Sequence, residues 1–102
     1  MAKKAETKDY IIEGRTKSGI AYRVDKRILE DSRFLYYAVG MRDSNKVKAV
    51  ESMYKMYSLL FGDGDGLLLF QNEIAAAHDG ICTTTLLITE LNEILETVKA
   101  KN

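Results

Sequence analysis

The hydrophobic pattern of the chain is strongest over residues 45–61, NKVKAVESMYKMYSLLF. On a helical wheel this stretch carries two apolar stripes, one beginning with Val47 and Val50 and the other including Met53 and Met56. Polar side chains share the remaining arc. Apolar residues over roughly half the circumference indicate a helix that is covered from more than one side. We therefore predict a central helix over 45–61, with the rest of the chain folded around it.

The segment before this helix has the periodicity of strands. Apolar and polar or small residues alternate over 20–24, and Ser18-Gly19 suits the tight turn that would join this strand to 10–17. Gly14 suggests a bulge or bend in the first strand. Because a two-stranded hairpin is marginal alone in water, it needs a helix beneath its apolar face or the strands of a second copy at its edge. The second option would make the protein a homo-oligomer.

Three further helical regions follow from apolar spacing, at about 26–41, 66–78 and 85–99. Gly62 suits the left-handed position after the central helix. Candidate N-caps are Asp25, Asp31 or Ser32, Ser44 or Asn45, Asp65, and one of Thr83, Thr84 and Thr85. Residues 1–9 lack an apolar anchor and are predicted to be a mobile tail. The predicted fold is α+β, mainly α: one domain, 10–102, with a hairpin over 10–24 and a bundle of about four helices.

Composition narrows the classes of function. A chain of 102 residues favours one domain with a modest core. Fifteen basic and fifteen acidic residues cancel, so the chain has no built-in attraction to nucleic acid or to an anionic membrane. It contains no 18-residue apolar run, and its charged start lacks a secretory signal. A single cysteine cannot form an internal disulfide. We expect a cytoplasmic protein with neither nucleic acid nor membrane as a partner.

The glycine-rich break at 62–66, GDGDG, could suggest a calcium or phosphate loop. A calcium-binding EF-hand loop would need an oxygen ligand where Leu67 stands, glycine at Leu68 and glutamate at Ile74. A phosphate-binding P-loop would need a closing lysine, which is missing. A turn followed by a helix cap accounts for every residue of the break.

His78 and Cys82 are the only histidine and cysteine, four positions apart, with Asp79 as a formal third member of a triad. Cys82 follows Ile81 and has the pattern of a small buried apolar residue. One histidine and one cysteine are too few for a structural zinc site within one chain. Capping and a solvated face explain the remaining cluster of carboxylates, Asp25, Glu30 and Asp31. We predict no catalytic residue, no metal site and no cofactor.

Tyrosine and methionine offer the clearest candidates for contact with another protein. Tyr36 and Tyr37 are adjacent, so they point in different directions and cannot both be central in the core. Met53 and Met56 are of a type more often found in cores, although adaptable binding surfaces also favour methionine. We predict partner contact at whichever of Tyr36, Tyr37, Met53 and Met56 the fold leaves uncovered.

The order of these elements resembles a known family. The stretch KSGIAYRVDKRILEDSRFLYYAV, with Val24-Asp25, Ile28-Leu29, Asp31 and Phe34-Leu35, is similar to the opening of tail assembly chaperones of long-tailed phages and Gram-positive prophages. The central helix ending at Leu59–Gly62, a helix ending in Asp79-Gly80 and a last amphipathic helix, TELNEILETV, continue the resemblance. It covers roughly residues 12–98.

This resemblance implies a non-enzymatic factor of the host cytoplasm that holds the tape-measure protein during tail assembly and helps recruit tail-tube subunits. Such proteins are absent from the finished particle and are often also made in a longer, frameshifted form. A small apolar groove could reversibly mask the apolar stripes of a long helical tape measure. Two alternatives remain open: a small helical DNA-binding regulator, and a structural head–tail or tube component.

Overall fold

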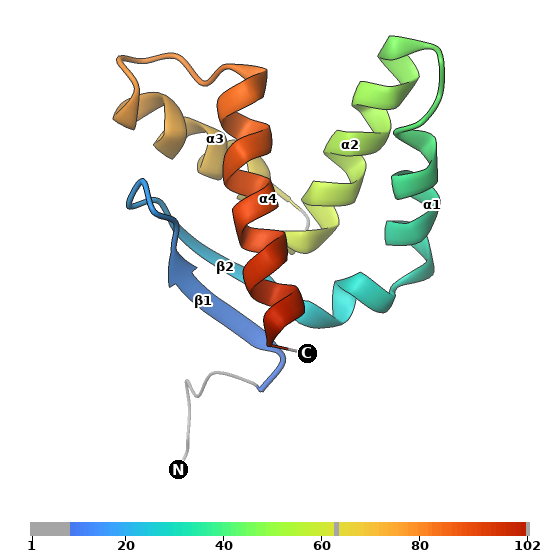
Figure 1. The fold of residues 1–102 in the computed structure, drawn as a ribbon, viewed down its shortest axis with the longest axis horizontal. Helices are drawn as coiled ribbons and strands as arrows, with labels where there is room; N and C mark the ends of the chain where they lie inside the picture. Colours follow the sequence, from blue (N-terminus) through green and yellow to red (C-terminus); the bar gives the residue numbers. More distant parts are fainter. Residues whose placement is uncertain (1–8, 63, 102) are drawn as a thin grey trace.

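The computed structural model describes residues 9–62 and 64–101. Within these ranges the chain forms a hairpin, a short 3-10 helix and four α-helices (Figure 1). They are β1 (Ile11–Arg15), β2 (Ala21–Asp25), η1 (Lys26–Glu30), α1 (Ser32–Gly40), α2 (Lys46–Leu60), α3 (Gly66–Ala77) and α4 (Thr84–Ala100). The predicted α+β, mainly α class is confirmed. Except for Asp9, the predicted tail of residues 1–9 lies outside the described residues.

Helix starts follow the capping chemistry expected from the sequence. In four of them the side-chain oxygen of the cap accepts a backbone N–H two or three positions further on, and these caps are Asp25, Asp31, Asn45 and Thr83. The cap predicted at Asp65 is wrong. Its backbone has φ −95° and ψ 8° rather than the extended conformation of the other caps, and its side chain makes no capping hydrogen bond.

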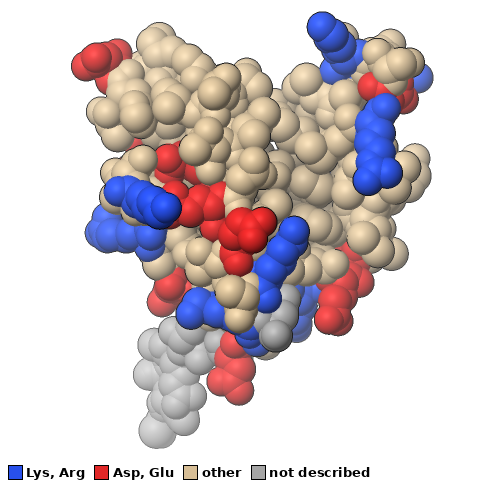
Figure 2. Space-filling model, in the orientation of Figure 1, with Lys and Arg blue, Asp and Glu red and all other residues tan. Residues whose placement is uncertain are grey.

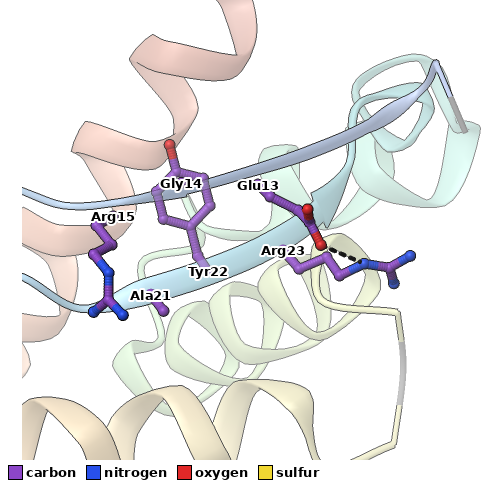
Figure 3. A pocket seen from close by; sticks show the side chains of 6 residues that line it. All are labelled: Glu13, Gly14, Arg15, Ala21, Tyr22 and Arg23. Atoms are coloured by element: carbon purple, nitrogen blue, oxygen red, sulfur yellow. Dashed lines mark hydrogen bonds and ion pairs between the residues drawn. The ribbon is translucent and has the colours of Figure 1, made fainter. Parts of the chain in front are cut away.

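The hairpin has an unbroken antiparallel register in which Gly14 lies opposite Tyr22. The predicted bulge at Gly14 is therefore wrong. A Cβ atom at Gly14 would lie 2.9 Å from the Tyr22 hydroxyl oxygen, so glycine leaves room for the ring that crosses it (Figure 3). The irregular position is instead Gly19, whose φ of 87° closes the three-residue turn after Thr16.

One core joins the hairpin to the helices. Helix α4 crosses the sheet (Figure 1), and the buried side of the hairpin supplies Ile12 and Val24. The least exposed side chains of the core are Leu60, Ile74, Leu87, Leu91, Ile94, Val24 and Val98. Four of these seven come from α4, so the C-terminal helix contributes more to the centre of the core than any other element.

Two glutamates of α4 hold the hairpin turn. The Ser18 hydroxyl donates to Glu90 Oε2 at 2.9 Å, and the backbone N–H of Lys17 donates to Glu93 Oε2 at 2.7 Å. Glu90 is only 3% exposed, and its second oxygen, Oε1, is buried without a hydrogen-bond partner among the described residues. The turn and α4 are therefore joined through one buried carboxylate and one partly exposed carboxylate.

Helices α1 and α2 form an arm beside this body (Figure 1). The fully buried residues of α2 begin at Met53, whereas the turns before it are exposed apart from the half-buried Ala49 and Ser52. The core thus covers only the C-terminal half of the predicted central helix. The N-terminal half, together with α1, stands away from it.

Candidate functional site

A groove runs between α1 and α2 along the arm, and we call it the tyrosine groove. One wall comes from α1, the other from α2, and the α1–α2 turn closes one end. Its lining residues are Tyr36, Tyr37, Val39, Gly40, Arg42, Asp43, Lys48, Glu51, Ser52 and Lys55. It contains both tyrosines that the sequence singled out.

The floor of the groove forms where α1 and α2 approach each other closely, at Gly40 and Ser52. A Cβ atom built on Gly40 would collide with Ser52 Oγ and lie 3.0 Å from Ser52 Cβ. Only glycine lets α1 and α2 meet at this point. A larger residue at position 40 would push the two walls apart.

The aromatic wall is largely open to solvent. Tyr36 is 75% exposed and Tyr37 is half-buried, and their rings meet edge to face with centroids 5.7 Å apart. Val39 is exposed beside them. On the other wall Lys55 Nζ lies 5.9 Å from the centroid of the Tyr37 ring. Large apolar side chains left in water in this way are typical of a surface that contacts another protein.

Charged side chains rim the aromatic wall. They comprise three cations and two anions: Arg42, Lys48 and Lys55, with Asp43 and Glu51. None of the five makes an ion pair within the described part of the chain. The cations are therefore available to carboxylates of a bound partner.

Met53 and Met56, the other two predicted contact residues, do not reach this surface. They are 6% and 4% exposed and belong to the core, because they lie on the face of α2 that also carries Leu60. The fold covers both methionines, so they cannot contact a partner at this surface. Partner contact by Tyr36 and Tyr37 stays a prediction.

A second apolar strip follows a third face of α2, between the groove face and the core face, and its exposed members are Val47, Val50 and Tyr54. Tyr54 turns toward α3, since its hydroxyl accepts a hydrogen bond from Gln71 Nε2 at 3.0 Å. In Figure 2 the upper part of the molecule between the arm and α4 is largely free of charge, whereas charged side chains gather around the hairpin and the lower end of α4. The spacing of apolar residues predicts that the stripe beginning with Val47 and Val50 is covered, and this prediction is wrong at both residues.

His78 and Cys82 form no reactive pair. No hydrogen bond joins them within residues 9–62 and 64–101, and burial raises the pKa of the Cys82 thiol, which disfavours the nucleophilic thiolate. His78 Nε2 is buried without a described partner. In the same ranges no group of three or more His, Cys, Asp and Glu residues is placed to hold a metal ion.

The acidic residues Asp25 and Asp31 serve as helix caps paired with arginines. Asp31 accepts hydrogen bonds from the side chain and backbone of Arg33, which lower its pKa to about 2. The side chain of Arg27 likewise lowers the pKa of Asp25. Both carboxylates are thus held ionised, in positions that stabilise helix starts.

Among the described helices, none is both long and apolar enough to cross a bilayer. Comparison with known proteins gives no matching family, no similar curated protein and no similar solved structure.

Proposed function

We propose that this protein is a tail assembly chaperone of a long-tailed phage or prophage, a binding protein without enzymatic activity. It would act in the bacterial cytoplasm, hold the tape-measure protein before the tail tube surrounds it, and help to recruit tube subunits. The resemblance of residues 12–98 to that family suggests the biological role. The exposed aromatic wall of the tyrosine groove is the single observation that supports it physically.

The chemistry of the groove suits an amphipathic helix. An apolar stripe on the partner would pack on Tyr36 and Val39, which have no covering element among the described residues. Acidic side chains beside that stripe would meet Lys48 and Lys55 across the groove. A long helical tape measure exposes apolar stripes until it is enclosed, so reversible cover of this kind would keep it from aggregating.

Co-expression tests the proposal directly. The protein is produced together with a long helical tape-measure protein of the same phage or prophage, and the soluble fraction is purified through a tag on the tape measure. We expect the chaperone to copurify and the soluble yield of the tape measure to rise. No binding to a tape measure that stays soluble would contradict the proposal. Steeply salt-dependent binding to duplex DNA, or recovery of the protein from purified particles, would favour one of the two alternatives.

A further inference from the structure

The two strands of the hairpin differ in how their outer edges are covered. The outer side of β2 faces α3: Ala21 and Arg23 line one crevice with Leu69 and Glu73 of that helix. In Figure 1, β1 runs along the margin of the molecule, with no labelled element on the side away from β2. An open strand edge of this kind is a template for a further strand.

Hydrogen bonds at the two ends of the hairpin show which groups of β1 are free. The N–H of Lys26 donates to Tyr10 O at 2.8 Å, and the N–H of Thr16 donates to Ile20 O at 2.9 Å. Because bonded pairs alternate along an antiparallel ladder, the even-numbered residues of β1 bond to β2 and the odd-numbered residues point outward. The peptide groups of Ile11, Glu13 and Arg15 therefore face the open edge. They have no hydrogen-bond partner among residues 9–62 and 64–101.

We propose that β1 pairs antiparallel with β1 of a second copy of this chain, joining two hairpins into a four-stranded sheet. Only the odd-numbered residues of β1 have free backbone N–H and C=O groups. Each odd-numbered residue of one copy must therefore lie opposite an odd-numbered residue of the other copy. Centring the pair on Glu13 would put two glutamates opposite each other. Centring it on Gly14 instead places Glu13 opposite Arg15 of the second copy, twice by symmetry.

Charge complementarity thus selects both the partner and the register. Glu13 already bonds Arg23 on its own hairpin at 3.0 Å, so in the dimer its carboxylate would lie between two arginines. Arg15 uses one amino group to donate to Gly19 O at 2.8 Å, and its other nitrogens have no hydrogen-bond partner among the described residues. Gly14 at the centre adds no side chain to obstruct the close approach of the strands.

The seam is short. The N–H of Lys17 is bonded to Glu93, so pairing ends before the turn and consists of the main-chain bonds between Glu13 and Arg15 of the two copies. We therefore expect a reversible dimer. The tyrosine groove lies on α1 and α2, across the molecule from β1 (Figure 1), so this inference does not rest on the proposed function and its failure would leave groove binding untouched.

Charge exchange on the full-length protein tests the register. Sedimentation velocity over a concentration series should show a monomer–dimer equilibrium for the natural chain. Glu13→Arg and Arg15→Glu each create two like-charged contacts and should weaken dimerisation by about tenfold or more. The double exchange Glu13→Arg/Arg15→Glu should dimerise like the natural chain. An equal mixture of the two single variants should form a heterodimer.

The mixture is the internal control, because a variant that dimerised poorly through misfolding could not be rescued by the other. Far-UV circular dichroism of each single variant checks its fold. A natural chain that stays monomeric at every concentration would overturn the proposal. A dimer that persists equally in both single variants would overturn it as well, because its interface would lie elsewhere.

Discussion

Tyr22 lies across the hairpin from Gly14, and its ring occupies the space that any side chain at position 14 would need (Figure 3). The closest approach is between the built Cβ and the hydroxyl oxygen, at 2.9 Å, followed by Cζ at 3.1 Å. An aromatic ring over a cross-strand glycine compensates for the packing that glycine lacks. The pair therefore couples the choice of residue at one position to that at the other.

This coupling can be measured with a double-mutant cycle. Gly14→Ala should destabilise the natural chain by about 1 kcal/mol, because the half-buried Tyr22 ring must move. In a Tyr22→Ala background the same change should be neutral or stabilise by roughly 0.5–1 kcal/mol, since alanine costs less backbone entropy than glycine in a strand. Urea unfolding of the four proteins gives the coupling energy. Equal effects of Gly14→Ala in both backgrounds would refute the coupling.

The hydrogen bond between Ser18 and Glu90 predicts that removing the donor alone costs more stability than removing both partners. Ser18→Ala removes the only described hydrogen bond to a carboxylate that is 3% exposed, and it should cost about 1–3 kcal/mol of unfolding free energy. Ser44→Ala, at an exposed serine, is the matched control and should change stability by less than about 0.5 kcal/mol. Adding Glu90→Met to Ser18→Ala removes the stranded carboxylate and should recover much of the loss. A further loss instead would argue that Ser18 is not the group that compensates the burial of Glu90.

Acid should weaken the start of α1. The pKa of Asp31 falls from 3.8 to about 2 on folding, mainly through the side chain of Arg33. A carboxyl whose pKa is lowered in the folded state stabilises it fully above its unfolded pKa and loses that contribution as the pH falls through the folded value. Asp31→Asn keeps a cap oxygen but cannot ionise. The stability difference between the natural chain and Asp31→Asn should be constant above about pH 5 and shrink between about pH 4 and pH 2. A difference that persists unchanged to pH 2 would contradict this assignment.

Truncation to alanine should lower the stability of the fold strongly at Met53 and hardly at all at Tyr36. Met53→Ala leaves a hole beside the core and should cost about 2–4 kcal/mol. Tyr36→Ala removes a ring that is 75% exposed and should change stability by less than about 0.5 kcal/mol. Thermal or urea unfolding distinguishes the two. A large loss in Tyr36→Ala would mean that its ring has a structural role that its exposure does not suggest.

The fold could be predicted from the sequence wherever local chemistry decides the structure. Asn45 and Thr83 cap their helices because their side chains reach backbone groups two or three residues away, whatever the rest of the chain does. The role of Gly14 could not be predicted, because it depends on a ring from the other strand. Asp65 has the right residue type for a cap, yet the backbone of the glycine-rich break sets its conformation.

The candidate site was less predictable for a related reason. Helical spacing shows that α2 has a wide apolar surface, but it cannot show how far along the helix the core extends. The core covers α2 from Met53 to Leu60 but does not reach its first turns, so Val47 and Val50 of the same helix are left in solvent. Adjacent tyrosines, by contrast, must diverge in any helix, so the sequence predicts that Tyr36 and Tyr37 cannot both lie in the core, and the structure shows that Tyr36 is the exposed one.

The affinity of the tape-measure protein for variants of the groove tests the central claim that this chain works by lending apolar surface to another protein. Isothermal titration with a soluble tape-measure fragment would compare the natural chain, Tyr36→Ser, and Leu69→Ser as a control at an exposed apolar residue of α3. We predict that Tyr36→Ser weakens binding at least about tenfold, as loss of an aromatic hot spot does, and that Leu69→Ser changes it less than about twofold. Equal affinity of all three proteins, or no binding by the natural chain, would contradict the claim.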